Sequence, residues 1–290
     1  MPSALLASRR LQMAYPNLAI RRALLASSSS TRARETAQLT SKLEVERKFR
    51  PSQFLSRQLA FAIECQNPRP YQIKLDNLTL RCHNVHLIND RYFDIDNRLA
   101  LAGSWARRRS QTSVDLLSEW RSETTTWEVK QSLGGNYINS AMVEHEGRPK
   151  VFELWREHFS RTLDEDRDIS FDLDTYRMIW TALDEGDTDL SPEHYHVILD
   201  FVTSPAASFN PHQRDPFSHT VGEVEKTCEV RGGYDTEEHD RLRQLVVKDM
   251  DDCIAAFLCR HPTMFQTTLP PVGKLSALAA WKKDIIAGTV

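Results

Sequence analysis

The sequence predicts an α+β fold in which a closed antiparallel β-barrel carries flanking helices. Three observations lead to this prediction. Many short runs alternate apolar and polar residues, a few longer segments have helical spacing, and several of the alternating runs carry acids or bases at every second position. Alternation by itself fits a sandwich or a barrel, and the charged faces would converge only if the sheet closes into a barrel.

The predicted elements follow one another with few interruptions and no internal repeat. The predicted strands are Leu43–Phe49, Asn89–Asp96, Ser104–Arg109, Thr125–Gln131, part of Ile169–Trp180, His196–Val202 and His219–Cys228. Apolar residues three and four positions apart predict helices at Pro51–Glu64, Val151–Phe159 and Thr236–Cys259. The predicted loops are Ser110–Thr124, the Gly134-Gly135 turn and Ser204–Pro216. None of these loops is distinctive enough to separate two domains, so residues 42–290 are expected to form one domain.

Residues 1–41 differ in composition from the rest of the chain. The first 34 residues contain six arginines and a run of serines at positions 27–30, and they contain no Asp or Glu. This composition is typical of a mitochondrial presequence, and the stretch lacks the continuous apolar core of a secretory signal. The alternative is a disordered basic tail. We therefore expect a mitochondrial location, with the cytoplasm as the alternative.

The bulk properties argue against several classes of protein. No apolar stretch approaches the roughly 20 residues of a membrane-spanning helix, so no membrane partner is expected. Without the first 34 residues, 31 basic residues face 40 acidic ones, which argues against nonspecific nucleic-acid binding. The five cysteines are widely spaced and form no CxxC pair, which favours free thiols. We expect a monomer.

The stretch EVERKF at residues 44–49 places charges on one face of a predicted strand. Because strand side chains alternate between faces, Glu44, Glu46 and Lys48 point to the same side. Val45 and Phe49 lie on the opposite, apolar side. Taken alone, such a charged face is most simply explained by exposure to solvent.

Other predicted strands carry charged residues in the same way. If these faces converge inside a closed barrel, they line a polar tunnel in which a carboxylate cluster faces a cationic cluster. The acids are Glu44, Glu46, Asp200, Glu223 and Glu225, and the bases are Lys48, Arg107, Arg109, Lys130 and Arg177.

Two clusters of opposite charge in such a tunnel would each require a partner, because an unpaired buried charge is strongly desolvated. Carboxylate oxygens suit Mg²⁺, or alternatively Mn²⁺, and Arg and Lys side chains suit phosphate oxygens. No Ser-His-Asp set, CxxC pair or GxxxxGK[ST] loop offers a competing chemistry. The residues therefore predict that the tunnel binds a metal-bound polyphosphate.

An ordered set of motifs resembles the CYTH members of the triphosphate tunnel metalloenzymes. EVERKF has their ExExK form, and it is followed in order by YFDID, WARRR, WEVK, an Arg before an aromatic residue, an aspartate strand, VGEVE and PPVGKL. The resemblance spans residues 43 to about 280. Within the family, the chain is most similar to the thiamine triphosphatases. The resemblance implies the tunnel fold of this family.

The resemblance also implies roles for individual residues. The implied metal ligands are Glu44, Glu46, Asp200, Glu223 and Glu225, and the implied catalytic residues are Glu44, Glu46 and Lys48. The implied substrate-binding residues are Lys48, Trp105, Arg107, Arg109, Lys130, Arg177 and Lys274. Trp105 matches the position that recognises the thiamine moiety, and by alternation it shares a strand face with Arg107. An indole face is a good partner for the cationic thiazolium ring.

The implied activity is metal-dependent hydrolysis of thiamine triphosphate to thiamine diphosphate and phosphate. An inorganic tripolyphosphatase is the first alternative, because the same tunnel would serve it. A barrel that only sequesters a polyphosphate is the second, although binding alone would not need acids that repel the ligand. An adenylyl cyclase is disfavoured, because nothing marks a site for a nucleotide base. Residues 65–88, 110–124 and 204–216 are expected to be extra loops at the tunnel mouths.

Overall fold

The computed structural model describes residues 40–64, 71–75, 77–116, 120–135, 139–184, 195–205, 217–231, 237–266 and 270–286. Residues 1–39, which make up most of the predicted leader, and residues 206–216 of the predicted loop Ser204–Pro216 lie outside the described residues. None of the described helices is both long enough and apolar enough to cross a membrane.

Strands dominate the described part of the chain. They are β1 (Thr40–Pro51), β2 (Tyr71–Leu75), β3 (Leu78–Phe93), β4 (Ser104–Asp115), β5 (Arg121–Gly135), β6 (Asn139–Glu146), β7 (Ile169–Asp184), β8 (Tyr195–Thr203), β9 (Ser218–Arg231) and β10 (Phe265–Gln266). The helices are α2 (Gln53–Glu64), α3 (Arg98–Leu101), α4 (Arg148–Phe159), α5 (Glu237–Arg260) and α6 (Lys274–Ile286).

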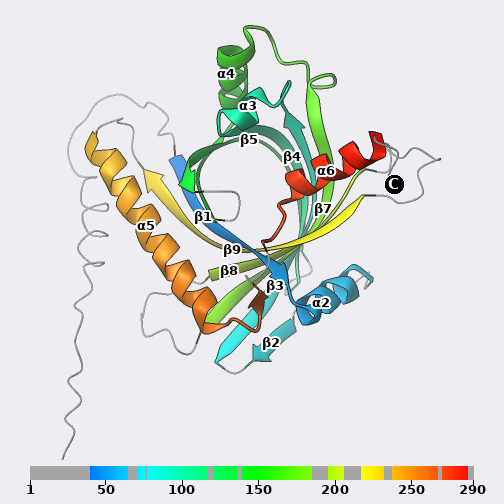
Figure 1. The fold of residues 1–290 in the computed structure, drawn as a ribbon, viewed down its shortest axis with the longest axis vertical. Coiled ribbons are helices and arrows are strands. Elements are labelled where there is room, and N and C mark those ends of the chain that lie inside the picture. Colours follow the sequence, from blue (N-terminus) through cyan, green and yellow to red (C-terminus); the bar gives the residue numbers. More distant parts are fainter. Residues whose placement is uncertain are drawn as a thin grey trace, which may run out of the picture. The chain divides into compact units, whose positions relative to one another are not determined.

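Eight of the described strands close into an antiparallel barrel (Figure 1). Their order is β1-β6-β5-β4-β3-β7-β8-β9, and β9 pairs with β1 to complete the ring. The short strands β2 and β10 extend the sheet outside the ring, on β3 and β1. The predicted fold, a closed antiparallel barrel with flanking helices, is confirmed.

The apolar core lies mainly on the outer face of this barrel. In β1 the odd-numbered Leu43, Val45 and Phe49 are buried outward. Helices α2 and α5 pack against the barrel at β1, and α3 and α4 cover β4 and β5 (Figure 1). Because the helices shield the apolar face, the inner face is free to carry the charged residues. One apolar cluster does not lie on the outer face. In it, Leu278 of α6 packs with inward-facing Tyr92 at one end of the barrel.

Close packing on the outer face explains one glycine of the VGEVE motif. Gly222 of β9 lies opposite Phe49 of β1 in the sheet. A Cβ atom at Gly222 would lie 2.4 Å from the Phe49 ring. The aromatic ring therefore occupies the space that any other residue would need.

Two predicted loops are wrong, because β4 and β5 are much longer than predicted. They form a hairpin in which Ser110 pairs with Thr125 and Thr112 pairs with Glu123, so most of Ser110–Thr124 is strand. The residues there are polar on both faces, and cross-strand pairing of polar side chains sustains the strands without apolar alternation. At the far end of β5, Gly135 has φ +87°, and a Cβ atom there would lie 2.1 Å from the Asn139 carbonyl oxygen. The Gly134-Gly135 pair thus ends the strand rather than forming the turn itself.

The predicted extra connection at residues 65–88 is wrong from residue 71 onward. Residues 71–75 and 78–88 belong to the hairpin of β2 and β3. A bulge between Cys82 and Asn84 moves Leu80 and Val85, which have opposite parity, to the same buried side. This bulge breaks the period of two, which explains why no strand was predicted there. Strand β6 is not among the predicted strands either.

Candidate active site

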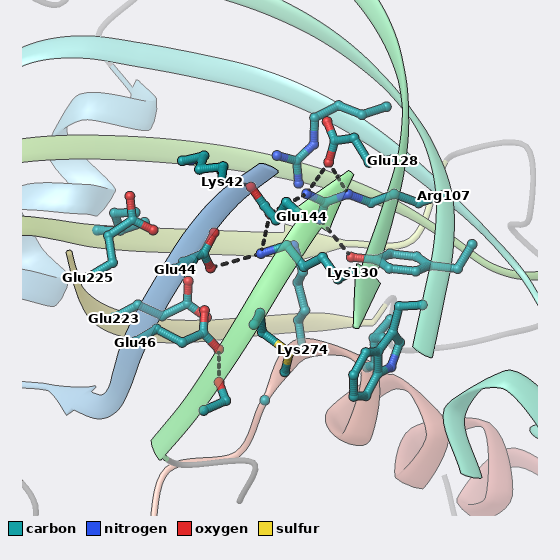
Figure 2. A pocket seen from close by; sticks show the side chains of 18 of the residues that line it. Lys42, Glu44, Glu46, Arg107, Glu128, Lys130, Glu144, Glu223, Glu225 and Lys274 are labelled. Carbon is teal, nitrogen blue, oxygen red and sulfur yellow. Dashed lines mark hydrogen bonds and ion pairs between the residues drawn. The ribbon is translucent and has the colours of Figure 1, made fainter. Parts of the chain in front are cut away.

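The barrel encloses a cavity of about 710 Å³. Its walls are the inward faces of the barrel strands, and the start of α6 closes part of it (Figure 2). All the predicted site residues except Asp200 line this cavity: Glu44, Glu46, Lys48, Trp105, Arg107, Arg109, Lys130, Arg177, Glu223, Glu225 and Lys274. Among the described lining residues, seven are acidic and seven are basic. The net charge of the cavity walls is therefore close to zero, although many individual side chains in them are charged.

The acids of β1 and β9 form one side of the cavity (Figure 2). They come together because Glu46 lies opposite Glu225, and Lys48 opposite Glu223, in the pairing of β1 with β9. The Lys48 ammonium bridges this group, since it contacts Glu46 closely and lies 3.4 Å from Glu223 Oε1. Ser140 of β6 donates a hydrogen bond of 2.8 Å to Glu46. The acids are thus held beside one another by an amine.

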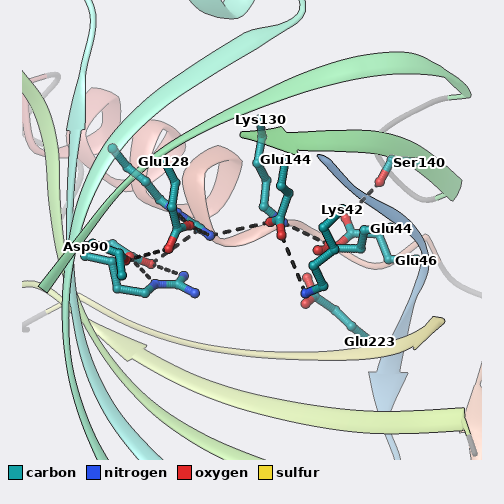
Figure 3. Close-up of polar contacts among 12 residues, drawn as sticks. Lys42, Glu44, Glu46, Asp90, Glu128, Lys130, Ser140, Glu144 and Glu223 are labelled. Atoms are coloured by element: carbon teal, nitrogen blue, oxygen red, sulfur yellow. Dashed lines mark hydrogen bonds and ion pairs between the residues drawn. The ribbon is translucent and has the colours of Figure 1, made fainter. Parts of the chain in front are cut away.

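Lys130 of β5 joins an acid of β1 to an acid of β6. Its Nζ lies 2.8 Å from Glu44 and 2.7 Å from Glu144. Figure 3 shows Lys130 and Glu144 between the acids of β1 and β9 and the pair of Asp90 and Glu128. The sequence suggested two separate clusters that each need an external partner. Instead, the acids and bases of the cavity neutralise one another.

These contacts set the charge states of the acids. Burial opposes the charged form of Glu44, but the Lys130 ammonium outweighs it, and the pKa of Glu44 lies below its ordinary value. Burial and the nearby Glu223 both oppose ionisation of Glu46, but Lys48 and Lys130 outweigh them and lower its pKa. Conversely, Glu223 and Glu46 raise the pKa of Lys48 despite its burial. Both glutamates and the lysine are therefore charged at neutral pH.

The predicted metal ligands are not arranged as a finished metal centre. Within the described residues, no three Asp, Glu, His or Cys side chains converge closely enough to hold a metal ion as they stand. Glu46 and Glu223 nevertheless approach the same ammonium group of Lys48. Two carboxylates that converge on one cation have the oxygen chemistry that Mg²⁺ prefers. The donor set therefore fits a divalent cation if Lys48 turns away.

Asp90 organises the basic side of the cavity, and the sequence analysis did not single it out. Its fully buried carboxylate accepts two hydrogen bonds from Arg109, of 2.7 and 2.8 Å. The same carboxylate lies 3.3 Å from Lys274 and 3.9 Å from Arg107. Burial opposes its charge, but these bases hold the pKa of Asp90 well below its usual range. One acid thus positions three of the predicted phosphate-binding side chains.

Arg107 is fixed from a second direction. Its Nε donates a hydrogen bond of 2.7 Å to Glu128, and its Nη1 donates one of 3.3 Å to the Tyr92 hydroxyl. Thr126 in turn donates a hydrogen bond of 2.7 Å to Glu128. Glu128 therefore belongs to the tunnel, although it is not among the predicted site residues.

Asp200 does not occupy the place that the sequence suggested. It is fully buried and does not line the cavity. Its carboxylate accepts hydrogen bonds of 2.7 and 2.6 Å from Nε and Nη2 of Arg177. Such a two-point pair fixes the plane of the guanidinium group. In this structure Asp200 positions Arg177 and is not one of the acids that line the cavity.

Trp105 lines the cavity near the end that α6 covers. It is half-buried and packs against the cluster formed by Tyr92, Leu173 and Leu278. The indole is thus both part of the cavity wall and part of the packing of α6. This position suits the predicted role of Trp105 in binding a ring, and it also suits a packing role beneath α6.

Several residues of the cavity were missed by sequence reasoning. Asp90 lies two positions before Tyr92 and therefore on the same, inner face of β3, so strand alternation could have identified it as a cavity residue. Glu144 was left open because β6 was not predicted. His86 lies beyond the predicted start of its strand, and it lines the cavity beside the basic residues.

The shifted pKa of His86 makes the stability of the protein depend on pH. Burial, with Arg177 and Arg109 nearby and only partly offset by Asp200, lowers its pKa to about 4. An unfolded histidine titrates near 6.5. Because the folded pKa is lower, the stabilisation is fully present above about pH 6.5 and is lost as the pH falls towards 4.

We therefore expect the free energy of unfolding, measured by urea denaturation, to decrease between about pH 6.5 and 4. His86→Gln should show a shallower decrease over this window. Identical slopes for the two proteins would contradict the assignment of this dependence to His86.

Comparison with known proteins supports neither the fold nor the function. No protein-family model matches the chain, and no curated protein matches its sequence. Among solved structures, the chain is similar to a protein from Hippeastrum that is assigned as an adenylyl cyclase and described as having a dominant triphosphatase activity. The identity is 15%, the alignment covers 82% of this chain and 95% of the other, and the TM-score is 0.34. A similarity at this level carries no argument about function.

Proposed function

We propose that this protein is a metal-dependent triphosphatase that hydrolyses thiamine triphosphate to thiamine diphosphate and phosphate inside the barrel. The observation that carries the proposal is the enclosed cavity in which fixed arginines and lysines face a group of ionised glutamates. The ordered motifs that resemble the CYTH family support the same function. An inorganic tripolyphosphatase is the second candidate, since the cavity offers the same groups to an unsubstituted triphosphate.

The basic side of the cavity suits a triphosphate because its groups are held in place before the substrate arrives. Arg109 and Arg177 each donate two hydrogen bonds to one buried carboxylate, which holds them in place. Pre-organised guanidinium groups lose little side-chain entropy when they bind phosphate oxygens. Gly273 and the first residues of α6, Lys274–Ser276, also line the cavity, and a helix N-terminus favours anions.

The acidic side suits a divalent cation that accompanies the substrate. The lining acids and bases are equal in number, so a triphosphate would add negative charge that the bases cannot balance alone. We propose that Glu44, Glu46, Glu223 and Glu225 hold Mg²⁺ or Mn²⁺. When bound, the ion would neutralise charge on the transferred phosphoryl group. Lys48 would then move away from Glu46 and Glu223, and its ammonium group would contact the phosphate oxygens.

The chain's own residues account for the rest of the reaction. A water molecule attacks the terminal phosphorus, and the bond from this phosphorus to the bridging oxygen breaks. The arginines stabilise the leaving diphosphate, which carries the bridging oxygen away with its negative charge. Ionised Glu44 or Glu46 can accept a hydrogen bond from the attacking water and orient it. The products are thiamine diphosphate and inorganic phosphate.

Turnover measurements test the proposal directly. The purified protein should release phosphate from thiamine triphosphate with Mg²⁺ or Mn²⁺ and lose this activity with EDTA. Tripolyphosphate and ATP are the comparison substrates. A higher kcat/KM for tripolyphosphate than for thiamine triphosphate would favour the second candidate. Tight binding of thiamine triphosphate and tripolyphosphate without any turnover would favour a polyphosphate-binding module.

Trp105→Ala tests whether the substrate carries a thiazolium ring. An indole contributes about 0.5 to 2 kcal/mol to the binding of a cationic ring. We therefore expect the KM for thiamine triphosphate to rise severalfold, while the KM for tripolyphosphate, which has no ring, changes little. Equal losses on both substrates, together with a lower Tm, would show that Trp105 acts through its packing against α6.

A further inference from the structure

His86 lies at the end of the cavity away from Trp105. Trp105 lies near the start of strand β4 and Ser113 near its end, and Ser113 lies opposite His86 of β3. On its other side, β3 pairs His86 with Arg177 of β7. His86 is therefore next to a predicted phosphate-binding arginine, at the opposite end of the tunnel from the half-buried indole.

The contacts of His86 determine which ring nitrogen carries the proton. Nδ1 lies 2.7 Å from Gln111 Nε2 and 2.8 Å from Ser113 Oγ. An amide nitrogen can only donate, so Nδ1 accepts a hydrogen bond. A neutral imidazole has one N–H group, which must then be at Nε2. Gln111 also donates a hydrogen bond of 2.8 Å to Ser113, so the three side chains form one closed network.

The Nε2–H group is the polar part of the ring that remains available to the cavity. His86 lines the cavity, and Nε2 has no hydrogen-bond partner among the residues that the structure describes. Burial and the neighbouring arginines also lower the pKa of His86 to about 4, which keeps the ring neutral at physiological pH. A neutral donor beside Arg109 and Arg177 can bind an anionic oxygen without adding a third positive charge.

We propose that His86 donates a hydrogen bond from Nε2–H to a phosphate oxygen at this end of the tunnel, and that Gln111 fixes the ring in the required tautomer. The inference rests on the proposed function and adds to it a neutral phosphate-binding residue. The oxygen belongs either to the terminal phosphate of the bound substrate or to the inorganic phosphate that is released.

Substitution of His86 by two residues of different chemistry tests the proposal. His86→Leu removes the donor, whereas His86→Gln retains an N–H group near the position of Nε2. Calorimetry without divalent cations measures the binding of tripolyphosphate and of inorganic phosphate. A hydrogen bond to a charged group corresponds to roughly a tenfold change in affinity or more. His145→Leu is the matched control, because His145 lies on β6 and does not line the cavity.

We expect His86→Leu to weaken binding of tripolyphosphate, inorganic phosphate or both about tenfold, and His86→Gln and His145→Leu to weaken it much less. Loss with tripolyphosphate identifies a substrate subsite, and loss with phosphate alone identifies a product subsite. If the wild-type protein binds tripolyphosphate and His86→Leu binds both ligands as tightly, the inference is wrong while the proposed function stands. If the wild-type protein binds tripolyphosphate only when Mg²⁺ is present, the same comparison of variants is made with Mg²⁺. If it binds tripolyphosphate neither without nor with Mg²⁺, the proposed function itself fails.

Nuclear magnetic resonance of the ¹⁵N-histidine-labelled wild-type protein gives a test without mutation. The His86 ring should be the neutral Nε2–H tautomer at pH 7, and its Nε2–H signal should shift when tripolyphosphate is added. Gln111→Leu should allow the Nδ1–H tautomer to appear. A ring that is protonated at Nδ1 in the wild-type protein, or an Nε2–H signal unmoved by saturating tripolyphosphate, would overturn the proposal.

Discussion

Replacing Glu46 by glutamine is expected to reduce kcat/KM for triphosphate hydrolysis by at least about a hundredfold, because altering the surroundings of a metal site already costs 10- to 100-fold. Glu46 is ionised despite its burial, and its carboxylate converges with that of Glu223 on the Lys48 ammonium. The amide keeps the size of the side chain and can still accept the hydrogen bond from Ser140. The loss should therefore come from the missing charge and not from a missing contact.

The expected loss can be separated from general effects of glutamate removal. Glu153→Gln is the control, because Glu153 is exposed on α4 and forms a surface ion pair with Lys150, three positions earlier. This variant should keep wild-type activity. The Mg²⁺ concentration for half-maximal activity should also rise in Glu46→Gln. Near-normal turnover of Glu46→Gln at saturating Mg²⁺ would remove Glu46 from the metal-binding acids.

Asp90→Ala is expected to have the largest effect on stability. Removing one partner of a buried ion pair typically costs about 3 to 5 kcal/mol, because the remaining charge is left without compensation. Asp90 is fully buried and faces three bases, Arg107, Arg109 and Lys274. We therefore expect a decrease of this size in the free energy of unfolding, measured by urea denaturation at pH 7.

Two further variants make this prediction specific. Asp90→Asn retains the shape and part of the hydrogen bonding, so it should fold with a smaller loss of stability if Asp90→Ala does not fold. Asp166→Ala is the matched control, because Asp166 is exposed and substitutions at such positions change stability by less than about 0.5 kcal/mol. A loss of under about 1 kcal/mol for Asp90→Ala would contradict the role of Asp90 as the anchor of the basic side.

Much of the candidate site was predictable because strand alternation is a local property. In β1, Glu44, Glu46 and Lys48 face the cavity, while the alternate residues pack outward. The same holds for Arg107 and Arg109 in β4. Wherever the period of two is unbroken, the sequence alone identifies the residues that share a face.

Prediction failed where the local pattern is interrupted or uninformative. The bulge at Cys82 and Asn84 reverses the parity of β3, which hid the first part of the strand and with it His86. The polar hairpin at Ser110–Thr124 has no apolar face, since its strands are held by pairing between polar residues. Periodicity cannot detect strands of either kind.

By itself, the sequence determined most of the charged residues that face inward, because alternation within single strands assigns them to one face. The closed barrel was implied by the ordered motifs, since alternation alone also fits a sandwich. Only the tertiary structure decided which of these charges meet. Barrel closure brings Glu223 of β9 to Lys48 of β1, and the register of β7 with β8 places Asp200 behind Arg177. The pairing of β3 with β4 makes Asp90 the partner of Arg109. These contacts join residues far apart in the chain, so the electrostatics of the tunnel depend on strand register, which no local pattern specifies.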